Sequence, residues 1–102
     1  MRLFSRRSRG GASLDRAATR EDVDHLDRFA RSRRGVEAYV EPQTATTQTT
    51  LVLIAYDGEW TRRRVDGPQE ARRLAERWGV PCYEAAVVGY PQRMREWNSR
   101  QR

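Results

Sequence analysis

The chain has 102 residues, and its 20 basic residues are all arginine, against 14 acidic residues and one histidine, for a formal net charge of +6. Residues 1–20 hold six arginines and one acidic residue, whereas residues 21–102 hold fourteen arginines and thirteen acidic residues. This uneven distribution argues against a uniformly basic domain that wraps nucleic acid. A single cysteine excludes an internal disulfide bond, and no apolar run reaches the roughly 18–20 residues that span a bilayer, so we expect no membrane contact.

The absence of lysine has two interpretations. Arginine binds phosphate and carboxylate groups through two parallel hydrogen bonds and stacks on bases, so a chain that grips RNA would favour it. A GC-rich coding sequence produces the same bias without any function. Because the acid-rich segments also lack lysine, we favour the coding bias.

Residues 1–18 form the first predicted unit, a basic tail. Apart from Met1, its first 13 residues have only two large apolar side chains, Leu3 and Phe4, so the tail buries too little surface to offset the entropy of ordering. We therefore expect it to be disordered. No hydrophobic stretch follows the pair Arg6-Arg7, which argues against an export signal and favours a cytoplasmic protein, with an organellar transit peptide as the alternative.

The predicted domain, residues 19–102, begins with a helix. Thr19 is a good N-cap, and Asp22 three residues later completes a pair that resembles a capping box. Apolar residues then recur at helical spacing, and Gly35 is a left-handed stop. The apolar stripe consists of Val23, Leu26, Phe29 and Ala30.

Three strands are predicted next. Residues 36–41 alternate with period two, which indicates a strand with one face in solvent, whereas residues 51–56 are apolar on both faces and indicate a central strand. Asp57-Gly58 predicts a two-residue type I′ hairpin turn, because that turn requires positive φ angles. The third strand, residues 59–65, has Trp60, Arg62 and Arg64 on one face.

A second helix is predicted from Pro68, which suits a first turn, to Gly79, which ends it. Residues 80–88 are predicted to be a fourth strand. A short last helix follows Gly89-Tyr90-Pro91 and should dock on the sheet through its aromatic residues and Met94. The order α-β-β-β-α-β-α predicts an α+β fold: a single small domain with a mostly antiparallel four-stranded sheet packed with helices, in which a helical crossover delivers the last strand.

The sequence shows no motif for catalysis or for a cofactor. One histidine and one cysteine exclude a Cys/His zinc site, and no Gly-x-Ser-x-Gly, Walker or dinucleotide motif occurs. A pair of Cys82 with His25 stays formally open, but a buried cysteine and a histidine beside an apolar stripe are the favoured interpretation. We expect no catalytic residue, no cofactor and no metal, and we lean towards a protein that is not an enzyme.

Two basic features are candidate contacts with nucleic acid or another partner. Flexible arginine segments such as the tail bind phosphates in a salt-dependent manner, although a tail that only improves solubility is equally consistent. Trp60 and Arg62 could together stack on a base, although an edge strand protected by charge against aggregation is the favoured alternative. The candidate residues are Arg2, Arg6, Arg7, Arg9, Trp60, Arg62 and Arg64.

From the first helix onward the chain resembles a set of short, arginine-rich proteins of high-GC actinobacteria. The resemblance runs along most of residues 20–98, and the segments that carry it are residues 34–42 (RGVEAYVEP), 57–65 (DGEWTRRRV) and 89–95 (GYPQRMR). Members of this set are often automatically named oxidoreductase. The resemblance therefore implies a bacterial, cytoplasmic protein and a small oxidoreductase or redox subunit, but it brings no catalytic or cofactor residue with it.

These observations lead to three hypotheses. The first is a non-enzymatic α+β binding module that contacts RNA or a ribonucleoprotein through its tail, which predicts salt-sensitive binding that tail deletion abolishes. The second is the small oxidoreductase, which requires a bound chromophore or a Cys82 thiol with a depressed pKa. The third is a protein–protein adaptor, whose partner should stay bound after tail deletion and at high salt.

Overall fold

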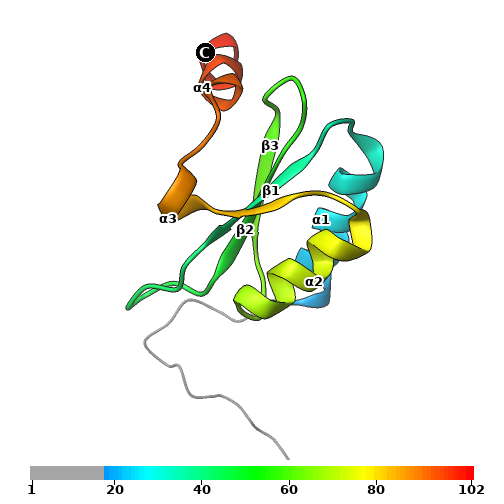
Figure 1. Ribbon diagram of the computed structural model, residues 1–102, viewed down its shortest axis with the longest axis vertical. Helices are drawn as coiled ribbons and strands as arrows, with labels where there is room; N and C mark the ends of the chain where they lie inside the picture. The colour runs from blue at the N-terminus through cyan, green and yellow to red at the C-terminus, as the bar shows by residue number, and fades with distance from the viewer. Residues whose placement is uncertain (1–17) are drawn as a thin grey trace, which may run out of the picture.

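The computed structural model describes residues 18–102, so the candidate tail residues Arg2, Arg6, Arg7 and Arg9 lie outside the described residues. The described elements follow the predicted α+β order, with one short extra helix, α3, before the last (Figure 1). None of the helices in this part of the chain is long and apolar enough to cross a membrane. The elements are α1 (Arg20–Ser32), β1 (Glu37–Glu41), β2 (Thr50–Ile54), β3 (Trp60–Arg64), α2 (Pro68–Trp78), β4 (Cys82–Glu84), α3 (Ala85–Val88) and α4 (Gln92–Arg100).

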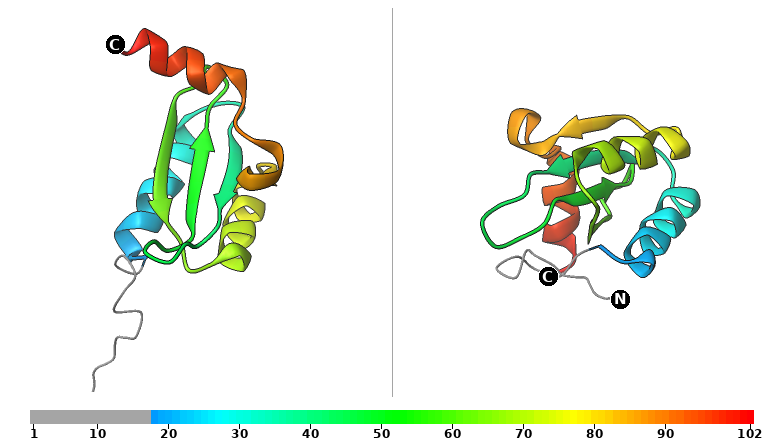
Figure 2. Two further views of the ribbon diagram at one scale, coloured as in Figure 1. Left: turned by 90° about the vertical axis from the view of Figure 1, so that its left-hand side faces the viewer. Right: turned by 90° about the horizontal axis from the view of Figure 1, so that it is seen from below.

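The four strands form one sheet in the order β3-β2-β1-β4. The first three strands are antiparallel neighbours, whereas β4 lies parallel to β1 after the crossover through α2. Helices α1 and α2 cover one face of the sheet, and α4 crosses the other side at the end where the β2–β3 hairpin turns (Figure 2). The mostly antiparallel sheet and the helical crossover are thus as predicted.

Strand β2 is buried on both faces. Leu51 and Leu53 point into the larger core under α1 and α2, whereas Val52 and Ile54 point to a smaller cluster that Met94 of α4 closes. The prediction of a central strand is confirmed, because a strand covered on both sides needs apolar residues on both faces. The buried Met94 also confirms that α4 docks on the sheet.

The prediction that β1 has one face in solvent is wrong. All three central residues of the strand are buried, because the ring of Tyr39 packs against the rings of Tyr83 and Tyr90. Glu37 and Glu41 flank Tyr39 on the same face, so alternation alone indicated a polar surface there.

The helix ends agree with local capping rules. The Thr19 hydroxyl accepts a hydrogen bond from the Asp22 backbone N–H at 3.2 Å, and the Asp22 carboxylate accepts one from the Thr19 N–H at 2.9 Å, which confirms the capping box. Helix α1 ends at Ser32, before Gly35, although Gly35 does have a positive φ of 60°. Helix α2 ends at Gly79, whose φ of 69° and ψ of 32° are left-handed as predicted.

The β2–β3 hairpin is present, but its predicted two-residue turn is wrong. The Ala55 N–H donates to the Glu59 carbonyl at 2.8 Å and the Gly58 N–H donates to the Ala55 carbonyl at 3.0 Å, so the loop holds three residues, 56–58. Gly58 has a φ of 95°, as expected for a three-residue hairpin loop whose last residue has a positive φ. The Asp57 carboxylate favours this form because it accepts a hydrogen bond from the Glu59 backbone N–H at 3.0 Å.

The fourth strand, predicted over residues 80–88, is only three residues long. Strand β4 ends at Glu84, and the next four residues form the single turn of α3. The last parallel pair is Val40 with Glu84, and β1 itself ends at Glu41. A longer β4 would have no neighbour for its backbone groups, so the chain turns into a helix there.

Candidate functional site

Strand β3, which carries Trp60, Arg62 and Arg64, is an edge strand of the sheet. Trp60 lies opposite Ile54 and Arg62 opposite Val52, so the two share one face of the strand as predicted, and this face is on the α4 side of the sheet. The Arg62 guanidinium lies 5.2 Å from the centre of the Trp60 ring. Trp60 and Arg62 therefore lie together on a charged edge strand, an arrangement that fits both the stacking interpretation and the interpretation of an edge protected by charge.

Both side chains are held in place by partners. The Arg62 Nε and Nη2 donate to the two carboxylate oxygens of Glu41 at 2.7 and 3.0 Å, and the Trp60 indole N–H donates to the Asn98 side-chain oxygen at 2.8 Å. Arg62 keeps 42% of its side chain exposed. Arg62 is therefore a positioned cation that still faces solvent, with part of its charge neutralised.

Glu41 is the centre of this network, and sequence reasoning missed it. Its carboxylate accepts hydrogen bonds from Arg62, from the Thr50 hydroxyl at 2.6 Å and from the Tyr90 hydroxyl. Burial would raise the pKa of Glu41, but these hydrogen bonds outweigh it and the pKa is lowered. Burial and the carboxylate together raise the pKa of Tyr90 to about 12.

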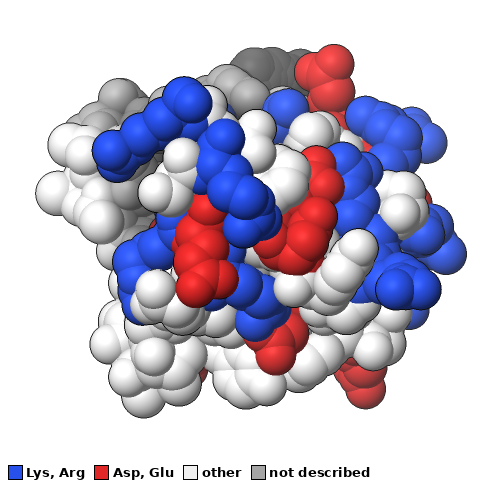
Figure 3. Space-filling model, turned by 90° about the horizontal axis from the view of Figure 1, so that it is seen from above, with Lys and Arg blue, Asp and Glu red and all other residues white. Residues whose placement is uncertain are grey.

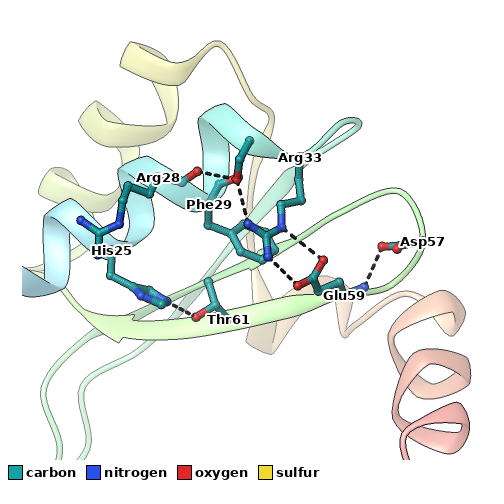
Figure 4. A network of polar contacts seen from close by, with 8 residues as sticks. His25, Arg28, Phe29, Arg33, Asp57, Glu59 and Thr61 are labelled. Atoms are coloured by element: carbon teal, nitrogen blue, oxygen red, sulfur yellow. Dashed lines mark hydrogen bonds and ion pairs between the residues drawn. The ribbon is translucent and has the colours of Figure 1, made fainter.

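On the opposite side of β3, helix α1 and the strand enclose a hollow of about 240 Å³, here called the α1–β3 hollow (Figure 4). His25 on α1 places its Nε2 2.6 Å from the Thr61 hydroxyl oxygen, and its Nδ1 lies 3.4 Å from Nη2 of Arg63. The hollow is lined by His25, Arg28, Phe29, Arg33, Glu59, Trp60 and Thr61.

The charges around His25 keep its ring neutral. Burial, followed by the guanidinium groups of Arg63, Arg28 and Arg33, lowers the pKa of His25, and Asp22 opposes them only in part. Because the ordinary pKa of histidine already lies below 7, the imidazole carries one proton at neutral pH.

The two other arginines of the hollow differ in their contacts. Arg33 donates from Nε and Nη2 to the two carboxylate oxygens of Glu59 at 3.1 and 2.6 Å, and its guanidinium lies 4.5 Å from the Phe29 ring centre. The Arg28 guanidinium, by contrast, makes no hydrogen bond or ion pair within residues 18–102. A ligand in this hollow can therefore bind the Arg28 guanidinium without breaking a hydrogen bond or ion pair within the described residues.

A second hollow, of about 370 Å³, lies at the other end of β3 and is here called the arginine hollow. Thr19 and Asp22 start α1 beside it, so the first of the described residues lie at this side of the sheet. Arg63 has 37% of its side chain exposed although it pairs with the buried Asp22. The hollow is lined by Asp22, Thr47, Gln48, Thr50, Arg62, Arg63 and Arg64.

Elsewhere in residues 18–102, several arginines form ion pairs that reduce the surface field. Examples are Arg31 with Asp27, Arg73 with Glu70, and Arg93 with Glu37 at 2.6 Å. Basic and acidic side chains are accordingly intermixed on the end of the molecule where α4 lies (Figure 3). The β3 edge also contains ion pairs, but it is where five arginines border two hollows: Arg28, Arg33, Arg62, Arg63 and Arg64.

Cys82 and His25 are not brought together. Cys82 lies on β4 and His25 lies against β3, so they are at opposite edges of the sheet. Burial raises the pKa of the Cys82 thiol, which is opposite to the direction that a reactive thiolate requires. Within residues 18–102 no group of three His, Cys, Asp or Glu side chains is placed to hold a metal ion.

An apolar surface lies at the β4 edge. The side chains of Tyr83, Val87 and Val88 are 38%, 77% and 56% exposed, next to an open groove of about 350 Å³ that Tyr39 and Tyr90 also line. The sequence indicated a strand here, so it did not reveal that these residues would be exposed.

Comparison with known proteins adds nothing to these observations. No family model, curated protein or solved structure matches the chain.

Proposed function

We propose that the protein is a non-enzymatic binding module that holds the phosphate backbone of RNA along the β3 edge, alone or within a ribonucleoprotein, with the arginine-rich tail as a second contact. The observation that carries this proposal is the gathering of five arginines around two hollows on one edge strand, at the side where the tail joins the chain. Guanidinium groups bind phosphate oxygens through paired hydrogen bonds, and such contacts supply most of the affinity for nucleic acid.

The acidic partners of these arginines set the strength of the contact. Arg33, Arg62 and Arg63 each pair with a carboxylate, yet between 37% and 42% of each side chain stays exposed. The carboxylates therefore orient the guanidinium groups and reduce their net charge. We expect weak binding by the edge alone and tighter binding when the tail adds its own arginines.

The test is fluorescence anisotropy with a labelled single-stranded RNA across a salt series. In the full chain, Arg6, Arg7 and Arg9 are replaced by glutamine, and the matched control replaces Arg72, Arg73 and Arg77 of α2, which removes the same charge far from β3. Loss of three phosphate contacts should reduce the slope of log affinity against log salt by roughly 2 in the tail variant. Equal losses in both variants would show an effect of net charge alone, and no binding by the unsubstituted protein would exclude the proposal.

The exposed apolar surface at the β4 edge favours a second candidate, a protein–protein adaptor. Val87 and Val88 are exposed on α3, a helix of four residues of which none is fully buried, and exposed apolar patches mark partner sites. This candidate predicts a protein partner whose binding is unaffected by high salt and by the tail substitutions, but is abolished by Val87→Asp. A partner lost by the tail substitutions would contradict it.

A further inference from the structure

We propose that the α1–β3 hollow holds one phosphate group of the RNA backbone, bound by the Thr61 hydroxyl and the Arg28 guanidinium, and that His25 makes this contact stronger at acidic pH. The inference rests on the proposed function and assigns one phosphate of the bound strand to a particular place.

The direction of the hydrogen bonds determines what the hollow offers to a ligand. A guanidinium can only donate, so the contact from Arg63 makes Nδ1 of His25 an acceptor. The proton of the neutral ring therefore sits on Nε2, which donates to the Thr61 oxygen at 2.6 Å. Thr61 accepts this bond, and its own O–H has no acceptor among residues 18–102. It is left to donate into the hollow.

The net charge of the lining selects an anion. Arg33 is held by Glu59 on one side and donates from Nη1 to the Ser32 hydroxyl at 2.7 Å on the other, so this pair contributes little net charge. Arg28 is the charge that remains, because His25 is neutral. A free guanidinium and a free hydroxyl donor at one hollow form a binding pair for a phosphate oxygen.

The size of the hollow limits what can enter. Its volume of about 240 Å³ lies below the roughly 300–1,000 Å³ of pockets that enclose whole ligands. A phosphate with its sugar outside fits this description better than an enclosed metabolite does.

His25 connects the contact to pH. The groups that face it are Asp22 and Arg28 on α1, Arg33 after the helix, and Arg63 and Glu59 on the β3 side. The guanidinium groups oppose protonation in the free protein. A bound phosphate introduces a negative charge that offsets them, so binding favours uptake of a proton, and by linkage lower pH favours binding. We expect about tenfold tighter binding at pH 5.5 than at pH 8.

The experiment uses the fact that His25 is the one histidine of the chain, so its imidazole NMR signals are unambiguous. The full chain is titrated with pH, with and without an eight-nucleotide oligouridylate, whose phosphodiesters do not titrate in this range. We expect the oligonucleotide to raise the titration midpoint of His25. Arg28→Gln and Thr61→Val should remove this rise, whereas Arg72→Gln on α2 should leave it unchanged. Thr61→Val keeps the shape of the side chain and Arg28 is exposed, so both variants should fold.

The outcomes separate this inference from the proposed function. Oligonucleotide binding that leaves the His25 midpoint unchanged would overturn the inference while the proposed function stands. A midpoint that rises equally in Arg28→Gln and Thr61→Val would also overturn it, because the phosphate would then act from elsewhere. Absence of oligonucleotide binding would overturn both the inference and the proposed function.

Discussion

Gly58 is a residue at which helix α4 closely approaches the β2–β3 hairpin, and replacing it with alanine tests this packing. Gly58 has a φ of 95°, and a Cβ at this position would lie 2.0 Å from the Arg93 carbonyl oxygen and 2.9 Å from the Trp97 Cβ. The carbonyl belongs to the backbone of α4, so no change of rotamer relieves the contact. The helix or the hairpin must move.

Two terms determine the expected loss of stability. A positive φ costs an alanine about 1–2 kcal/mol. Displacement of α4 exposes Met94, now 7% exposed, which costs about 1.5–3 kcal/mol. It also breaks the hydrogen bond from Arg93 Nε to the Ala55 carbonyl at 2.9 Å. We expect Gly58→Ala to lower the free energy of unfolding by about 3–5 kcal/mol, a large share of the roughly 5–15 kcal/mol typical of a domain.

Gly79→Ala is the matched control, because Gly79 also has a positive φ, of 69°, but apart from its chain neighbours no atom of residues 18–102 lies within 4 Å of the place that a Cβ would take. Gly79→Ala should show only the cost of a positive φ, about 1 kcal/mol. Urea unfolding followed by circular dichroism gives both values, and hydrogen exchange of α4 shows whether that helix loosens first. Equal destabilisation by the two substitutions would refute the close contact of α4 with the hairpin.

Three further predictions concern polar side chains that make contacts within the fold, those of Asp22, Glu41 and His25. Asp22→Ala should lower the free energy of unfolding, measured in urea, by about 1–3 kcal/mol, because it removes the capping box and the carboxylate that faces Arg63. The control Asp24→Ala, at an exposed position, should cost less than about 1 kcal/mol. Glu41→Gln should cost about 1–2 kcal/mol, since it removes the charge that Arg62 pairs with, and a thermal midpoint equal to that of the unsubstituted protein would contradict the network. The pKa of His25 is lower in the folded protein than in the unfolded chain, so the unfolded chain binds an extra proton as the pH falls below the ordinary histidine pKa. The free energy of unfolding should therefore decrease from pH 7 to pH 5.5. His25→Gln should flatten this part of the stability profile.

The element order could be predicted from the sequence because its signals are local. The capping box of Thr19 and Asp22 and the glycine that ends α2 act within one or two turns of helix. The apolar residues on both faces of β2 indicated its central place, because burial on two sides leaves no position for a polar side chain. These features indicate the class of fold without knowledge of any distant contact.

Contacts between distant segments decided the rest. Tyr39 is buried because α4 and the segment before it return to cover β1, and β4 is short because its partner strand ends at Glu41. The candidate site depends on the same kind of contact, since His25 and Thr61 are 36 residues apart and meet only because α1 packs against the β3 edge. Spacing along the chain does not show which strand is at the edge or which helix covers it. The sequence by itself therefore determined the elements and the charge of the tail, whereas the tertiary structure decided that, in the α1–β3 hollow, Arg33 is paired with Glu59 and Arg28 is left for a ligand.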